Sequence, residues 1–152
     1  MGQRMLHIVD IEADAADIYR AISTAEGLRS FWTADADAEP VVGSRARFGF
    51  PQAPVDLHME VTDLQAGARV TWQCLGDFPF WAGTAIDWSI GPNPNGPGSR
   101  VTFLHGGWPD DYPEVEFGLV NFVWGQIVGR LKGYAETGVP HPIYPAETVA
   151  SA

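Results

Sequence analysis

The sequence predicts an α+β fold in which a curved antiparallel sheet of about seven strands wraps around one long C-terminal helix. Residues 84–90 and 101–105 alternate large apolar and polar side chains with a period of two, as half-buried strands do. Residues 113–137 repeat apolar side chains three and four positions apart, as an amphipathic helix does. Two short helical segments stand between the first strand and the remaining strands, which completes the expected order of elements.

The N-terminal elements are a strand and two short helices. Residues 6–11 alternate apolar and polar side chains and predict the first strand. A helix is expected over Ala13–Ile22, with Asp14 as its N-cap, because Asp is a preferred residue there. A second short helix is expected over Glu26–Trp32. Such a helix pair commonly packs across one end of a curved sheet.

The middle of the chain, from about residue 35 to residue 106, is a series of strands joined by short turns. Gly and Pro mark these turns, because neither residue continues a strand well. Residues 91–98 contain three prolines and three glycines, and we expect them to form a hairpin connection without a function of its own. The predicted strands cover residues 44–50, 57–64, 68–75, 81–90 and 100–108.

The long helix is expected to begin near Pro113, which is tolerated in a first turn, and to end at Thr137 before Gly138. Its sequence contains four glycines, each of which costs up to about 1 kcal/mol relative to alanine. Close approach of another surface is the usual reason for such glycines. The sequence leaves open whether that surface is the sheet, a second protomer or a ligand. The face expected to lie on the sheet consists of Phe117, Val120, Asn121, Trp124, Ile127, Val128, Leu131 and Tyr134.

Composition and short motifs exclude several classes of function. The chain has 9 basic against 19 acidic residues and no basic cluster, so we expect no nucleic-acid partner. The only cysteine, Cys74, excludes an internal disulfide, and the chain shows neither a secretion signal nor a run of about 18 apolar residues. We therefore expect a cytoplasmic protein without integral membrane association. No ligand-pair spacing or glycine-rich phosphate loop is present, so we expect no metal and no cofactor.

Four segments carry a resemblance to a known family: Ile11–Ile22, Gly27–Thr33, Trp81–Thr84 and Phe103–Trp108. They resemble the START-like (SRPBCC, Bet v 1-like) superfamily, in particular its bacterial branch similar to the activator of the heat-shock-protein ATPase. The resemblance implies one helix-grip domain over residues 1–152, with about 141–152 as a flexible or surface-lying tail. It also implies an elongated cavity between the long helix and the concave sheet face. Members include lipid carriers, hormone receptors, polyketide cyclases and co-chaperones, so the resemblance specifies the fold better than the function.

The candidate ligand-binding residues are those whose strand or helix phase points into this expected cavity. His105 is the one candidate for catalysis, because a histidine can act as a general acid or base or can orient a ligand carbonyl. The alternative, a core histidine with both ring nitrogens satisfied, is favoured, since no partner carboxylate stands at a fixed spacing. The full set is Phe48, Trp72, Trp88, Phe103, His105, Phe117, Asn121 and Trp124.

Three functions remain open at this point. The first is binding of an apolar or aromatic small molecule in the cavity. The second is an enzyme similar to polyketide cyclases and aromatases, with His105 as acid or base, although the non-enzymatic interpretation is favoured. The third is a co-chaperone-like module that binds a protein surface, and a homodimer is also open. A smooth apolar cavity favours binding, converging polar groups favour catalysis, and an exposed apolar patch favours interaction with a protein.

Overall fold

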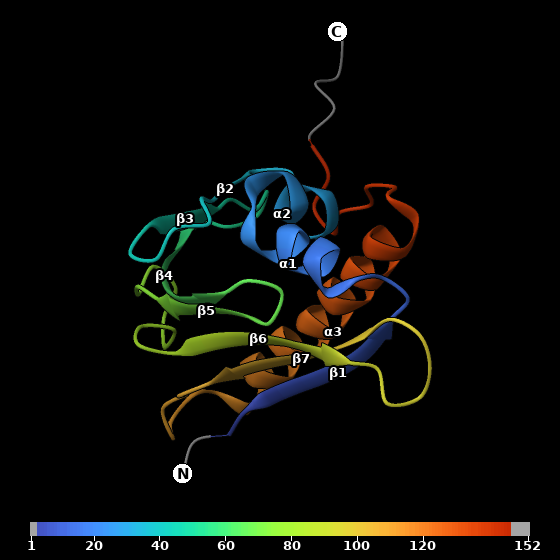
Figure 1. The fold of residues 1–152 in the computed structure, drawn as a ribbon. Helices are drawn as coiled ribbons and strands as arrows, with labels where there is room; N and C mark the ends of the chain where they lie inside the picture. The colour runs from blue at the N-terminus through green and yellow to red at the C-terminus, as the bar shows by residue number, and fades with distance from the viewer. Residues whose placement is uncertain (1–2, 147–152) are drawn as a thin grey trace, which may run out of the picture.

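A computed structural model describes residues 3–146 and places three helices on one side of a seven-stranded antiparallel sheet (Figure 1). The strand order is β1-β7-β6-β5-β4-β3-β2. The predicted α+β fold, with two short helices after the first strand and a long C-terminal helix, is confirmed. The elements are β1 (Met5–Ile11), α1 (Ala15–Ser23), α2 (Ala25–Phe31), β2 (Ala36–Asp37), β3 (Arg45–Phe48), β4 (Leu57–Gln65), β5 (Arg69–Cys74), β6 (Ala85–Pro92), β7 (Ser99–Gly106) and α3 (Glu114–Thr137).

Strands β6 and β7 form the hairpin that the sequence predicts. Trp88 lies opposite Phe103 and Ile86 lies opposite His105, and all four side chains are fully buried on the concave face of the sheet. The connecting loop ends at Gly98, whose φ of 92° is in the left-handed region. A side chain at Gly98 would also collide with the backbone of Ile11, so this turn requires glycine. The burial of these four paired side chains on one face of the sheet confirms the predicted strand phase.

Helices α1 and α2 follow one another with a single residue between them. Asp14 occupies the N-cap position of α1 as predicted, but its side chain makes no capping hydrogen bond. The capping side chain belongs instead to Thr24, which lies between the helices and accepts a hydrogen bond from the Gly27 backbone N–H at 3.2 Å. A Cβ at Gly27 would overlap the backbone of Ala21, so glycine permits the sharp change of direction between the two helices.

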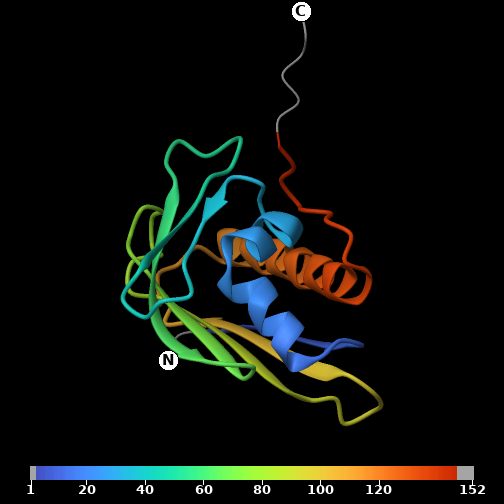
Figure 2. The same ribbon diagram turned by 45° about the horizontal axis from the view of Figure 1, so that its top comes forward.

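Helix α3 lies across the concave face of the sheet, on the same side as α1 and α2 (Figure 2). Four of its predicted inward residues are buried, namely Trp124, Ile127, Val128 and Leu131. The helix ends where the sequence predicts, at a left-handed Gly138 whose N–H donates to the Tyr134 carbonyl at 2.7 Å. Within residues 3–146 no helix is long and apolar enough to cross a bilayer.

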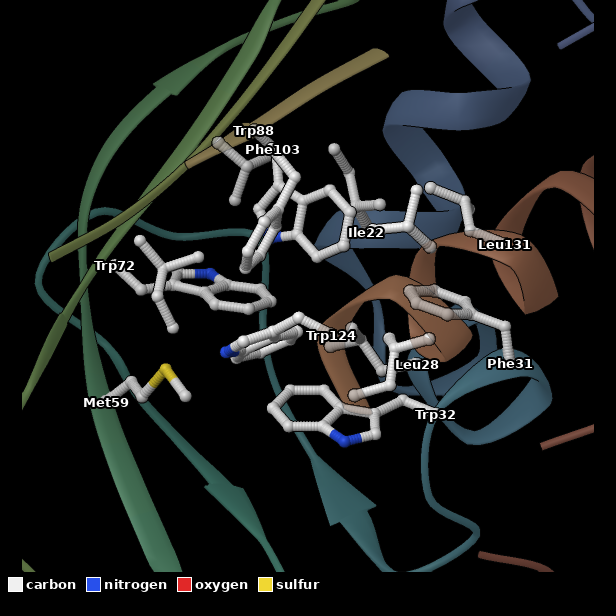
Figure 3. Close-up of a cluster of buried hydrophobic side chains, with 14 of the residues drawn as sticks. Ile22, Leu28, Phe31, Trp32, Met59, Trp72, Trp88, Phe103, Trp124 and Leu131 are labelled. Carbon is white, nitrogen blue, oxygen red and sulfur yellow. The ribbon is translucent and has the colours of Figure 1, made fainter. Parts of the chain in front are cut away.

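Large aromatic rings fill the centre of the interface between α3 and the sheet (Figure 3). The ring centroids of Trp88 and Phe103 lie 4.8 Å apart, and those of Phe103 and Trp124 lie 4.5 Å apart. Trp72 meets the ring of Trp88 edge-on at 6.0 Å. These are the separations of directly packed aromatic pairs. The gap that the sequence predicts between α3 and the sheet therefore does not lie beneath the middle of this helix.

The chain after α3 turns back along α2. The His141 N–H donates to the Ser30 carbonyl at 2.8 Å, and the Tyr144 N–H donates to the Trp32 carbonyl at 3.0 Å. The Tyr144 carbonyl accepts in turn from the Ala34 N–H at 2.9 Å. Residues 141–146 thus lie on the surface of the domain, attached by backbone hydrogen bonds. The rest of the predicted tail, 147–152, falls outside the described residues.

Candidate functional site

A cavity of about 580 Å³ lies along one flank of α3, where this helix approaches α2 and the loops at the end of the sheet. It is displaced from the filled aromatic centre toward the β3–β4 and β5–β6 connections. Its walls come from five parts of the chain that lie far apart in sequence. The lining residues are Trp32, Phe50, Pro51, Gln52, Ala53, Leu57, Phe78, Trp81, Leu119, Val120, Val123, Trp124, Ile127 and Tyr144.

Helix α3 supplies one wall through residues one turn apart. Val120, Trp124 and Ile127 belong to its inward face, and Val123 follows on the same flank, half-buried. Leu119 stands at the rim, with 62% of its surface exposed. Because positions three and four apart share one face of a helix, this wall follows from helical periodicity alone.

The opposite wall is built from loops and from the C-terminal segment. The Phe78 ring meets the Trp81 ring edge-on with centroids 5.4 Å apart. The Trp81 backbone N–H donates to the Phe78 backbone carbonyl at 3.1 Å. Between them, Phe80 has a φ of 71°, which is unfavourable for a residue with a side chain. Tyr144 meets Phe50 edge-on at 5.2 Å, so the C-terminal segment closes the side next to the β3–β4 loop.

The cavity lining is almost entirely apolar. Within residues 3–146, its walls contain no Asp, Glu, Lys, Arg, His or Cys side chain. Tyr144 is the one ionisable residue among them, and burial raises the pKa of its hydroxyl. This hydroxyl therefore stays protonated at neutral pH and can donate a hydrogen bond. The Gln52 side chain is exposed and lies at the solvent side of the cavity.

The sequence profile of the family "Activator of Hsp90 ATPase homolog 1-like protein" matches residues 12–136. The chain belongs to this family. The family lies within the SRPBCC or START-like superfamily, so the resemblance stated from the sequence is confirmed. Among curated proteins, none matches the chain significantly.

One solved structure supports this family assignment, and two others share the fold. The Aha1 dimer from Colwellia psychrerythraea is 30% identical, with a TM-score of 0.78, and the match covers 90% of this chain and 98% of that one. Protein MLL2253 from Mesorhizobium loti is 16% identical, with a TM-score of 0.73 and coverages of 86% and 95%. DynU16, from a dynemicin biosynthetic locus, is 21% identical, with a TM-score of 0.72 and coverages of 90% and 48%. MLL2253 and DynU16 are therefore similar to this chain in fold alone.

Of the predicted ligand-binding residues, the structure places only Trp124 on the cavity wall. Phe48, Trp72, Trp88 and Phe103 are enclosed in the core at 0–2% exposure. Phe48 and Phe103 pack directly against wall residues, with ring centroids 4.2 Å from Trp32 and 4.5 Å from Trp124. Ligand contact by these enclosed rings stays a prediction. In this structure they form the layer behind the cavity.

His105 is fully buried beneath α3 and does not line the cavity, although it lies directly behind Trp81 and Trp124, which do. Its Nδ1 accepts from the Trp124 indole N–H at 3.2 Å, and its Nε2 lies 2.9 Å from the Thr84 hydroxyl oxygen. Because the Thr84 hydroxyl donates to the Trp81 carbonyl at 2.7 Å, its oxygen is free to accept from Nε2–H. Burial lowers the pKa of His105 to about 3. Its geometry is that of a neutral core histidine with both nitrogens satisfied.

Phe117 and Asn121 lie on other surfaces of α3. Phe117 is half-buried beside Trp108 and Tyr112, with ring centroids 6.4 and 6.3 Å away. The Asn121 side-chain oxygen lies 2.9 Å from Nε2 of His7 on β1, on the flank of α3 opposite the cavity. Neither residue shares a wall with Trp124. Within residues 3–146, no three His, Cys, Asp or Glu side chains form a group that could hold a metal ion.

Sequence reasoning missed most of the cavity because loops supply it. Phe50, Phe78 and Tyr144 follow no period of two or of 3.6, so no strand or helix pattern selects them. One signal was available: residues 78–81 read Phe-Pro-Phe-Trp, three aromatics in a loop that contains proline. Loops usually lie on the surface and are polar, so such a loop indicates that it covers apolar surface or lines a pocket.

Proposed function

We propose that this protein binds an apolar or aromatic small molecule in the cavity beside α3. The observation that carries the proposal is a space of about 580 Å³ whose walls, among the described residues 3–146, hold no charged side chain. Pockets for small molecules are typically about 300–1,000 Å³, mostly apolar, with a few polar groups that orient the ligand. Apolar surface removed from water contributes roughly 25 cal/mol per Å², so such a cavity favours an apolar guest.

Two polar groups would orient the ligand. The Tyr144 hydroxyl, protonated at neutral pH, donates to a carbonyl or hydroxyl on the enclosed part of the ligand. Gln52, exposed at the solvent side, receives any polar end that remains in water. The expected ligand is therefore apolar over most of its length, with one hydrogen-bonding group and no charge inside the cavity. A cytoplasmic location is part of this proposal.

The same walls favour binding over acid–base catalysis. His105, the one residue proposed as acid or base from the sequence, is neutral and enclosed, and its ring nitrogens face the Trp124 indole and the Thr84 hydroxyl. General acid–base catalysis requires a group within hydrogen-bond reach of the reacting atom. The likeness to DynU16, at 21% identity, concerns the fold and supplies no catalytic group.

A cavity-filling variant tests the binding proposal. Val123→Trp places an indole in the space that α3 borders, and we expect affinity for a neutral fluorescent probe, N-phenylnaphthylamine, to fall at least tenfold, which is about 1.4 kcal/mol. Ile8→Trp is the matched control, because Ile8 is 54% exposed on β1 and does not line the cavity. Fluorescence titration measures both variants.

Two results would contradict the proposal. The first is a parent protein that binds neither the probe nor any molecule retained in native mass spectrometry after gentle purification. The second is a folded Val123→Trp variant that binds the probe as tightly as the parent.

We also propose that the chain forms a homodimer. The support is the Colwellia psychrerythraea protein, which is described as a dimer in solution and is 30% identical over 90% of this chain. Dilution of the purified protein with sedimentation analysis tests it. A mass that stays that of one chain up to millimolar protein contradicts it.

A further inference from the structure

The outward face of α3 lacks the charge that a solvent-exposed helix normally carries. Val115, Leu119 and Phe122 are 75%, 62% and 66% exposed on this face. From residue 118 to residue 133 its other members are glycines and Gln126, and the exposed Glu116 stands at its N-terminal border. A surface helix usually shows charged and polar residues opposite its buried stripe. In a chain with a net charge of −10, an uncharged apolar face of this length indicates a covering surface.

The glycines on this face have no explanation within one protomer. A Cβ at Gly118, Gly129 or Gly133 would meet nothing within 4 Å. Each nevertheless weakens the helix by up to about 1 kcal/mol relative to alanine. Gly125 differs, because a Cβ there would meet the His7 ring at 3.3 Å, so contact with β1 accounts for it. The other three glycines fit a face that another backbone approaches closely.

The face around Phe122 combines an exposed ring with a shallow, open hollow. A hollow of about 410 Å³ adjoins this ring and is lined by His7, Gly118, Asn121, Phe122, Gly125 and Gln126. A two-fold axis brings the same patch of two protomers together, so each needs both a protrusion and a recess. Phe122 is the protrusion, and the glycine-lined hollow beside it is the recess.

We infer that this outward face of α3 is where a second copy of the chain docks, with Phe122 of each protomer seated in the hollow of its partner. The inference rests on the homodimer proposed above and names its surface. Charge supports the choice of partner and of face. Two copies that each carry −10 repel one another over most of their surfaces, whereas residues 118–133 of this face present no charged side chain.

Phe122→Glu tests the interface, because it places a negative charge at the centre of the contact in both protomers. We expect the dimer dissociation constant to rise at least a hundredfold in sedimentation or light-scattering dilution series. Ile8→Glu is the matched control, because Ile8 is also exposed, at 54%, and lies on β1 away from this face. Leu119 is left unchanged in these variants, because it also lines the cavity.

Gly129→Gln separates an interface from a general effect on folding. Gln is a better helix former than Gly and has open space in the protomer, so the variant should unfold at a higher temperature. If two α3 helices approach closely here, the same change should weaken the dimer at least tenfold. A dimer that tolerates Gly129→Gln without loss overturns the close approach of the helices.

The remaining outcomes are distinguishable. A parent protein that is monomeric at all concentrations overturns both the dimer and this interface but leaves the cavity proposal standing. A parent dimer that Phe122→Glu does not dissociate overturns this interface alone. Probe binding, measured on the same samples, should be unchanged in Phe122→Glu, since Phe122 does not line the cavity.

Discussion

Two regions beside α3 use the same residue types to opposite effect. Beneath the middle of the helix, Trp88, Phe103 and Trp124 pack directly on one another, with ring centroids 4.8 and 4.5 Å apart. Along one flank, Phe50 and Phe78 border a cavity of about 580 Å³. Aromatic content alone does not separate a solid core from a binding site.

The difference lies in which elements carry the rings. The core rings of Trp72, Trp88 and Phe103 lie on the adjacent hydrogen-bonded strands β5, β6 and β7, with Trp88 directly opposite Phe103. Directly opposite residues in an antiparallel pair have Cβ atoms about 4.5–5.5 Å apart, which is contact distance for large side chains. The cavity rings of Phe50 and Phe78 come from separate loops, where no shared register sets their spacing. Strand pairing therefore packs the core rings together, whereas the loop-borne rings leave a cavity between them.

The largest expected effect is on stability, from Trp88→Ala. Trp88 is fully buried, so its removal should lower the free energy of unfolding by about 3–5 kcal/mol through lost contacts and an internal void. Phe78→Ala is the comparison, because this half-buried ring already borders open space, and we expect a loss of about 1 kcal/mol or less. Denaturant unfolding measures both. Equal losses would remove the distinction between core and cavity wall.

His105 sharpens the same contrast through pH. Its folded pKa is lowered to about 3 by burial, so below its unfolded value of about 6.5 the unfolded state binds the extra proton and stability falls with falling pH. Between about pH 6.5 and about pH 4.5 this contribution amounts to about 2–3 kcal/mol, at 1.36 kcal/mol per pH unit. Carboxylates whose pKa values are lowered by arginine partners, such as Asp10 and Asp37, add to the slope at the acid end. The comparison is therefore with His105→Phe, measured by urea unfolding at each pH.

His105→Phe also leaves the Trp124 indole N–H without its acceptor, so the variant should be less stable at neutral pH. Its stability should fall less steeply on acidification than that of the parent. Identical slopes for parent and variant would mean that His105 is accessible to protons in the folded state and is not sealed in the core.

The smallest expected effect concerns thiol reactivity and leaves stability almost unchanged. Cys74 is enclosed at 1% exposure, and burial raises its pKa to about 11, so little reactive thiolate forms at neutral pH. In a Val123→Cys variant, the introduced thiol on the cavity wall should react with a small maleimide long before Cys74 does. Peptide mass spectrometry identifies which thiol is modified. Faster labelling of Cys74 than of the introduced thiol would mean that β5 is more accessible to the reagent than the cavity wall.

Much of the architecture was predictable from local patterns. The alternation around Trp88 and Phe103 correctly predicted one buried sheet face, and the spacing of Trp124 and Leu131 correctly predicted the face of α3 that lies on it. The site was predictable only in part. Strand phase shows which side of the sheet a residue faces, but it does not show whether that side is filled, as the enclosed Trp72 illustrates.

The order of elements, the buried faces and the end of α3 at Gly138 could thus be read from local patterns, because each follows from the spacing of residues close in the chain. Where space remains depends on how these elements pack together. The cavity brings together Trp32, Phe78, Val123 and Tyr144, which are far apart in sequence and reach one another through loop paths without a repeating pattern. This packing also decides the role of His105, whose pKa depends on burial by residues from several elements. Burial and empty volume are properties of the assembled fold, which no local period encodes.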